Sequence, residues 1–391
     1  SAFRSRTDIS SIVFNNYEGN KNSLKFIREY AFAETGIRSI SIPGNVRTME
    51  EGLFFSCNEL TDFSFNILND SILASIEKIP DYCFFNCFNL NNISLDNRYN
   101  TSPNDSSSTL VEIGDYAFYN CENIENLNFL PNTIKIVGVE SFVNTGISGE
   151  LKTPEKLEII KESAFKNLTN VSEVILSENL KIIEKNAFYG CININKVVIK
   201  CPIITIASNT DRSAVFVGSG IRKLEIHNVN IDNNDNDISS NIFIPPSTFT
   251  PDESESKPIF PLIGQNVSDV SLINVENVGR KAFFQCSQLE KVMLDGVKII
   301  KERAFSDTGI QELTLSSSIK KLEEFSFANL LDISKITFHE TDLNIIDNNK
   351  IFLNSGTINI PNFEPSYNTI NITLSDASGR LNTTYYIKDF L

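Results

Sequence analysis

The chain has 391 residues, of which 41% are hydrophobic and 21% charged, and this composition argues against a globally disordered protein. Its net charge of −15 argues against nucleic acid or an anionic membrane surface as a partner. No apolar run approaches the ~18 residues of a membrane span. With two histidines and no tryptophan, the chain is also poor in residue types that are common in catalytic sites.

A phenylalanine recurs along the whole chain, most often at separations of 22 to 24 residues. Around it the shared phrase is small-Phe-x-x-Cys-x-x-Leu-x-x-Leu-x-Ile, with other aliphatic residues often in place of leucine, as in residues 187–199. A phrase of the form Val-x-x-Ile follows in several repeats, as at residues 297–300. A fixed period of this length predicts a solenoid of stacked coils. The anchor phenylalanines are Phe3, Phe32, Phe54, Phe84, Phe118, Phe142, Phe165, Phe188, Phe216, Phe283, Phe305, Phe327 and Phe352.

Each coil is expected to contain one short strand, because its last apolar positions alternate with polar ones. The phrase Ile124, Leu127, Phe129 fits this pattern as well as the others do, so we expect a strand there too. Neighbouring strands should form a parallel ladder, and the anchor rings should stack inside it. In some coils Thr-Gly or Ser-Gly replaces the cysteine, as at Gly36 and Gly146, and we expect this glycine to supply a left-handed corner.

Insertions divide the predicted array. We expect one repeat array over residues 1–226 and a second over 266–361, separated by a polar Pro-, Ser- and Asp-rich insertion or degenerate repeat at 227–265. Residues 362–391 leave the repeat phrase and predict a capping segment. The chain begins in the middle of a repeat, so we expect it to be part of a longer protein.

The repeat resembles the BspA-like leucine-rich-repeat family, whose short units of about 23 residues carry an Ala-Phe-x-x-Cys box. The match is close at residues 113–121. The resemblance implies an α/β solenoid-type repeat: a right-handed leucine-rich-repeat solenoid with a concave parallel β-sheet and an irregular convex side. It further implies a protein of the cell surface or a secreted one, with a role in adhesion or protein recognition. The family has no common catalytic residues to carry over.

The cysteines and histidines give no sign of a catalytic, cofactor or metal site. Five of the seven cysteines lie three residues after an anchor phenylalanine, which predicts small buried side chains of the core. A disulfide among Cys57, Cys87 and Cys121 stays open, since these lie in one register of consecutive coils. No pair of cysteines has metal-ligand spacing, so we expect no metal, no cofactor and no enzymatic activity.

The best candidate for a binding surface is an apolar strip bordered by cations on the outward face of the middle and late strands. The alternative is an ordinary solvated sheet face. The candidate residues are Ile175, Lys196, Val198, Arg222, Lys223, Lys291, Met293 and Lys335.

The sequence thus predicts a non-enzymatic recognition or adhesion solenoid that binds another protein on its concave face. The partner would be a host protein, an extracellular-matrix protein or a glycan, and the location the cell surface or outside the cell. The alternative is a cytoplasmic scaffold repeat protein within a larger assembly.

Overall fold

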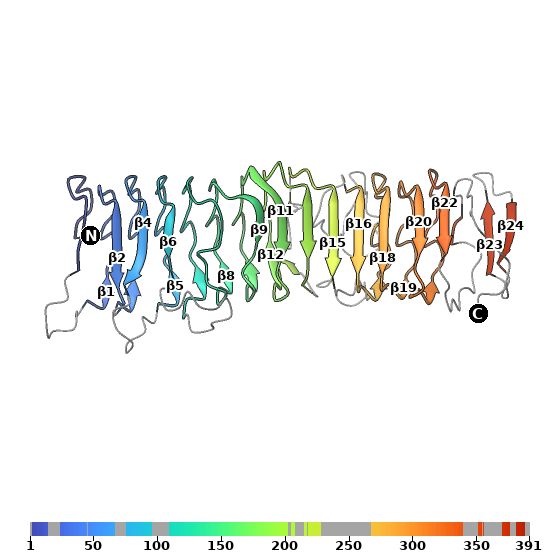
Figure 1. The fold of residues 1–391 in the computed structure, drawn as a ribbon, viewed down its shortest axis with the longest axis horizontal. Helices are drawn as coiled ribbons and strands as arrows, with labels where there is room; N and C mark the ends of the chain where they lie inside the picture. Colours follow the sequence, from blue (N-terminus) through green and yellow to red (C-terminus); the bar gives the residue numbers. More distant parts are fainter. Residues whose placement is uncertain are drawn as a thin grey trace. The chain divides into compact units, whose positions relative to one another are not determined.

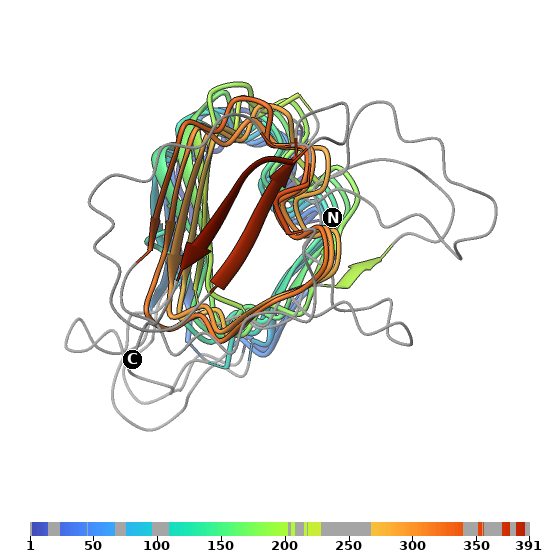
Figure 2. The ribbon, with the colours of Figure 1, turned by 90° about the vertical axis from the view of Figure 1, so that its right-hand side faces the viewer.

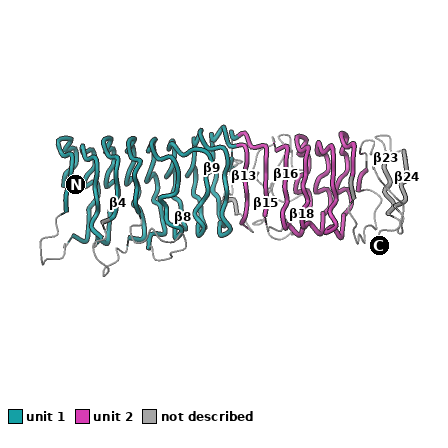
Figure 3. Tube along the Cα trace, in the orientation of Figure 1, with its two compact units in different colours: residues 1–194, 207–209, 215–219 teal, residues 195–206, 210–214, 220–391 magenta. Residues whose placement is uncertain are grey.

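The computed structural model describes residues 2–14, 24–44, 46–66, 76–95, 109–201, 205–207, 215–216, 218–227, 267–338, 351–353, 355, 370–375 and 381–387. Two compact units make up the chain (Figure 3). Unit 1 comprises residues 1–194, 207–209 and 215–219, and unit 2 comprises residues 195–206, 210–214 and 220–391. Within each unit the successive coils follow the same path, which is visible in the view along the stack (Figure 2).

Unit 1 contains two kinds of parallel ladder (Figure 1). One is made of longer strands: β2 (Ser39–Pro43), β4 (Asp62–Asn66) and β6 (Asn92–Ser94) in one sheet, and β9 (Ser148–Lys152) beside β11 (Asn170–Leu176). The other is made of short strands: β1 (Phe26–Ile27) beside β3 (Thr48–Met49), and β5 (Lys78–Ile79), β7 (Glu112–Ile113), β8 (Ile136–Val137), β10 (Ile159–Ile160) and β12 (Ile182–Glu184) in that order. A further short strand, β14 (Thr205–Ala207), has residues assigned to both units.

Unit 2 repeats the plan. Its long strands are β13 (Lys196–Ile199), β15 (Lys223–His227), β16 (Asp269–Ile273), β18 (Lys291–Asp295), β20 (Glu312–Leu315) and β22 (Lys335–Phe338), all parallel. Its short strands are β17 (Asn277–Val278), β19 (Ile299–Ile300) and β21 (Lys321–Leu322). β23 (Ile370–Ser375) and β24 (Leu381–Ile387) form an antiparallel hairpin. The predicted parallel solenoid of stacked coils is therefore confirmed. β15 and β16 pair in register, although residues 228–268 separate them in the sequence.

The anchor phenylalanines form a continuous stack in the core of each unit. In unit 1 the rings from Phe3 to Phe216 lie 4.7–5.7 Å apart, with interplanar angles of 6–16°. In unit 2 the rings from Phe283 to Phe352 lie 5.0–5.5 Å apart. Most of these side chains are fully buried. The predicted spine is confirmed within each unit.

The segment around each anchor phenylalanine is a series of turns and not a helix. The N–H groups of Tyr116, Phe118 and Asn120 donate to carbonyls of the next coil, whereas those of Tyr119 and Cys121 donate to carbonyls three residues back. Tyr116 and Asn120 have φ values of 57° and 58°. Left-handed residues four apart interrupt the run of right-handed residues that an α-helix needs. The described residues contain no helix, so the α component of the expected α/β class is not found among them.

In both the cysteine and the threonine versions of the repeat, a side chain donates a hydrogen bond to the backbone carbonyl of an anchor phenylalanine. The Cys87 thiol donates to the Phe54 carbonyl of the preceding coil, with Sγ 3.1 Å from the oxygen. In the Thr-Gly version, the Thr145 hydroxyl donates to the Phe142 carbonyl of its own coil at 3.1 Å. All seven cysteines lie among the described residues as buried free thiols, so the disulfide alternative is not realised.

The expected role of the glycine in the Thr-Gly coils was wrong. Gly146 does not adopt a left-handed conformation, but a Cβ added there would lie 2.1 Å from the Glu122 carbonyl oxygen of the preceding coil. Glycine is needed because two backbones approach closely. The left-handed residue in this coil is Asn144, with φ 55°.

An asparagine ladder links the left-handed positions of four coils. The side-chain amide of Asn120 donates to Asn86 at 2.9 Å, Asn144 to Asn120 at 2.8 Å and Asn167 to Asn144 at 3.1 Å. All four have φ between 55° and 62°. Asparagine suits these positions because it tolerates the left-handed region and its amide both donates and accepts.

Removing one ring from the spine should leave a cavity between two stacked neighbours. We expect Phe142→Ala to lower the free energy of unfolding by about 3–5 kcal/mol, since Phe142 is fully buried. Urea unfolding followed by circular dichroism measures the loss. Phe142→Leu serves as the control and should cost clearly less; equal losses for the two variants would contradict a packed ring stack.

The asparagine ladder gives a second prediction. Asn144→Ala loses two side-chain hydrogen bonds and also leaves at φ 55° a residue that tolerates the left-handed region less well than asparagine. Asn144→Gly loses the same bonds without the left-handed strain. We expect the alanine variant to be less stable than the glycine variant by about 1 kcal/mol. Thermal unfolding of the two variants side by side tests this order, and the reverse order would show that the position is not left-handed.

Candidate functional site

The predicted cations of unit 2 lie in one row across the long-strand sheet. In register along this row stand Lys196, Lys223, Asp269, Lys291, Glu312 and Lys335. Arg222 lies one residue before β15 and is exposed. Two carboxylates thus alternate with the lysines, and Lys335 lies 3.7 Å from Glu312. The row is closer to charge balance than its lysines alone suggest, because Asp269 lies between Lys223 and Lys291.

The apolar residues of the predicted strip differ in how far they are exposed. Met293 is 57% exposed, as expected, but Val198 is only 4% exposed and so does not contribute to the surface. Ile175 is half-buried on β11 of unit 1, whereas the other residues belong to unit 2.

Glu225 collects polar contacts on the outer face of unit 2. Its carboxylate lies 3.1 Å from the Lys196 ammonium and also contacts Nε2 of His227. Burial acts to raise the pKa of Glu225, but the hydrogen bonds from His227 and Lys196 outweigh burial and lower this pKa from its ordinary value of 4.5. The second histidine, His339, lies outside the described residues.

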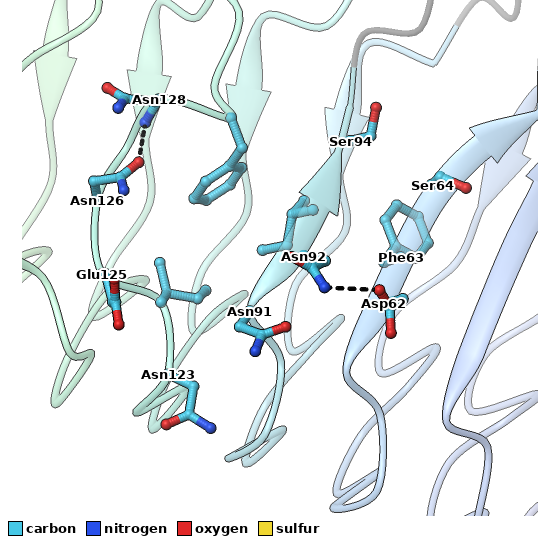
Figure 4. A pocket seen from close by; sticks show the side chains of 13 residues that line it. Asp62, Phe63, Ser64, Asn91, Asn92, Ser94, Asn123, Glu125, Asn126 and Asn128 are labelled. Carbon is cyan, nitrogen blue, oxygen red and sulfur yellow. Dashed lines mark hydrogen bonds between the residues drawn. The ribbon is translucent and has the colours of Figure 1, made fainter.

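A hollow of about 720 Å³ opens on the outer face of unit 1, in coils that the sequence analysis did not select (Figure 4). It lies between β4 and β6 on one side and the coil of residues 123–129 on the other. The lining residues are Asp62, Phe63, Ser64, Asn91, Asn92, Ile93, Ser94, Asn123, Ile124, Glu125, Asn126, Asn128 and Phe129. The volume is within the usual range of ligand pockets, about 300–1,000 Å³.

The hollow lies where the backbone hydrogen bonds between the long-strand sides of two successive coils are interrupted. In the coils before it, the N–H groups of Asn91 and Asn92 donate to the Thr61 carbonyl. In the coil after it, Ser148 donates to the Glu125 carbonyl at 3.1 Å. Among the described residues, no equivalent backbone bond reaches the carbonyl of Asn91. The sheet is therefore split between β6 and the coil of residues 123–129.

The local sequence explains why this coil forms no strand. Contrary to expectation, residues 124–126 are irregular and residues 127–129 form a bend and a turn. The Asn126 side chain accepts a hydrogen bond from the Asn128 backbone N–H at 3.0 Å, visible as a dashed line in Figure 4. Asparagine favours such local turns over a ladder, and it is rare in strands. The alternation of apolar residues was present, but the polar residues between them were strand breakers.

The walls of the hollow combine amides, carboxylates and apolar groups. Five of the lining residues are asparagines, two are carboxylates, and no lysine or arginine is among them. The Asn92 amide donates to the Asp62 carboxylate at 2.8 Å, which holds both side chains at the rim. Ile93 and Phe129 are half-buried, whereas Phe63, which pairs with Ile93 on the neighbouring strand β4, is only 1% exposed. The split has thus uncovered apolar groups that the repeat normally buries.

The buried thiols are poor candidates for chemistry. Burial raises the pKa of Cys191, Cys201 and Cys286 to about 12, so these thiols stay protonated at neutral pH. Within the part of the chain that the structure describes, no group of three or more His, Cys, Asp or Glu side chains is arranged to hold a metal ion. No helix in that part is long and apolar enough to span a membrane.

The contacts of Glu225 predict a pH dependence. A carboxyl group with a lowered pKa stabilises the folded state above its unfolded pKa, and this contribution disappears as the pH falls through the folded value. We expect Glu225→Gln to lose about 0.5–1 kcal/mol at neutral pH and nothing near pH 3. Urea unfolding at both pH values measures this, with Glu178→Gln as an exposed control; a loss that persists in acid would contradict an ionic origin.

The comparisons with known proteins agree with the repeat pattern. The model of the BspA type leucine-rich repeat region matches residues 1–97, 100–214 and 264–377 in six copies. A leucine-rich repeat protein from Bacteroides ovatus is 18% identical, with a TM-score of 0.38 over 84% of this chain and 89% of that one. A leucine-rich cell surface protein from Faecalibacterium prausnitzii is 15% identical, with a TM-score of 0.38 over 82% and 79%.

The pneumococcal vaccine antigen PcpA is 16% identical, with a TM-score of 0.27 over 87% of this chain and 74% of that one. A comparison with curated proteins gave no match. The family model covers most of the chain, and the matched ranges include strands of both units. The chain belongs to the BspA-type leucine-rich-repeat family.

Proposed function

We propose that this chain is a non-enzymatic recognition or adhesion protein that binds another protein through the outer face of its long-strand sheets. The hollow of unit 1 is the main contact site in this proposal. The observation that carries it is the split at β6, where a regular repeat is interrupted and both polar and apolar groups become accessible. A purely structural repeat gains nothing from an uncovered Ile93 and Phe129, because each exposed apolar group costs stability.

The proposal includes the geometry expected for the family. The long-strand sheets would form the concave side of a right-handed solenoid, and the turn segments the convex side. Partners then meet a surface built from many coils, which suits large, shallow contacts. A host or extracellular-matrix protein fits this surface best, with a glycan as the second class.

The proposed location is the cell surface or the extracellular space. Family membership supports this by association, and the fold alone does not determine a role. The buried free thiols suit a cytoplasmic scaffold equally well, since burial protects them in either compartment. Fractionation of the native cells, with an antibody to the chain, separates the two locations.

The test compares two charge reversals in unit 1. Glu125 lines the hollow, whereas Glu178 is exposed in the turn after β11 and lies outside the hollow. We expect Glu125→Arg to weaken binding to a panel of purified extracellular-matrix proteins by about tenfold, and Glu178→Arg to have little effect. Surface plasmon resonance measures both.

Both substitutions change the net charge equally, so they separate a local contact from a general electrostatic effect. Circular dichroism should show that both variants keep the wild-type fold. Equal effects of the two variants, or no binding of the wild-type chain to any member of the panel, would overturn the proposal of a protein-binding face centred on the hollow.

A further inference from the structure

The split beside β6 presents backbone groups with no partner strand. In a parallel ladder, alternate residues bond to opposite neighbours. The Asn92 N–H donates to Thr61 on the β4 side, so the peptide groups of Ile93 face the split. Among the described residues, no strand pairs with this edge of β6 and no backbone hydrogen bond reaches Ile93 from the coil of residues 123–129. An edge of this kind is a template for an added strand.

The opening is confined to the long-strand side of these coils. Behind it, the rings of Phe84 and Phe118 stack at 5.2 Å, and β5 pairs with β7. The Asn120 amide also reaches Asn86 at 2.9 Å. The two coils are therefore held together by the spine, the short-strand ladder and the asparagine ladder. The split is a local slot in a closed stack and not a separation of the two coils.

The slot has the alternating chemistry that a β-strand needs on its two faces. On the inner side lie the half-buried Ile93 and Phe129, with Ile124 behind them. On the outer side lie the amides of Asn92 and Asn126, drawn in Figure 4. A strand places successive side chains on opposite faces. An added segment would direct apolar side chains toward Ile93 and Phe129 and polar ones toward the asparagines.

The charges of the slot select among occupants. Among the described residues that line the slot, the charged ones are Asp62 and Glu125, and none is a lysine or arginine. A second copy of this chain carries a net charge of −15 and is repelled by the first. A basic segment of another protein is attracted. The outer positions of the added strand would therefore carry lysine or arginine near these carboxylates.

We infer that the slot beside β6 binds an extended, basic peptide segment of a partner protein, which adds to the edge of β6 as an extra strand. This rests on the proposed recognition function and specifies its partner. Backbone hydrogen bonds to Ile93 supply affinity, and the alternation of apolar and basic side chains supplies specificity.

The test uses the full chain and a fluorescein-labelled peptide of about six residues that alternates valine and lysine. Fluorescence anisotropy measures its dissociation constant. The key variant is Ile93→Pro, which removes the N–H that faces the slot and leaves the β4 ladder bonds intact. Ile93→Ala is the matched control, since it shortens the same side chain and keeps the N–H. We expect Ile93→Pro to bind about tenfold more weakly than Ile93→Ala.

Further measurements keep the inference falsifiable if the proline variant does not fold. In the wild-type chain, hydrogen exchange of the segment that contains Ile93 should slow when the valine–lysine peptide binds. A peptide alternating valine and glutamate should not bind. No protection at Ile93, equal affinity for the two peptides, or equal binding by the two variants would overturn the inference.

Two other outcomes separate this inference from the proposed function. If intact matrix proteins bind in a Glu125-dependent way while the peptide does not, the recognition function stands and the added strand is wrong. Binding of neutral oligosaccharides on a glycan array, without peptide binding, would also overturn the added strand and assign the slot to a glycan.

Discussion

The stacking of one phenylalanine per coil is the interaction on which the rest of the structure depends. In most coils the anchor residue fills the core with its ring and its N–H donates to the next coil, and in several coils its carbonyl also accepts a bond from a cysteine, threonine or serine side chain. The ring, the N–H and the carbonyl of one residue can thus all contribute to contacts between coils. A coil that keeps this residue is held in register whatever its outer strand does, because the register is set from inside the stack.

This arrangement explains how the outer sheet can vary without loss of the fold. At the coil of residues 123–129 the long strand is absent, yet the spine, the short-strand ladder and the asparagine ladder all continue past it. The cost of the missing strand is a few backbone bonds and a partly uncovered Ile93 and Phe129. The same irregularity produces the hollow and its unpaired strand edge, so the site arises where the repeat is least regular.

The two candidate surfaces differ in charge because strand register decides which charged side chains become neighbours. In unit 2 the lysines of the long strands stand beside Asp269 and Glu312, and Glu225 takes up Lys196 and His227. Two of the four lysines in the row, Lys196 and Lys335, therefore lie against carboxylates of the same sheet. In unit 1 the described lining of the hollow contains Asp62 and Glu125 and no lysine or arginine. The carboxylates of the hollow in unit 1 are therefore better placed to attract a charged partner than the lysines of unit 2.

The sequence alone determined the period, the buried face of each coil and the phenylalanine spine, because these depend on the spacing of apolar residues along one chain. It also indicated core positions for the cysteines, although the thiol bonds to the phenylalanine carbonyls were not foreseen. Only the tertiary structure decided which outward residues are neighbours, that Val198 is buried, and that the coil of residues 123–129 leaves a slot. Those features depend on contacts between coils. The asparagines at 126 and 128 were the one sign in the sequence that the strand would be lost, because their side chains favour turns that compete with the ladder between coils.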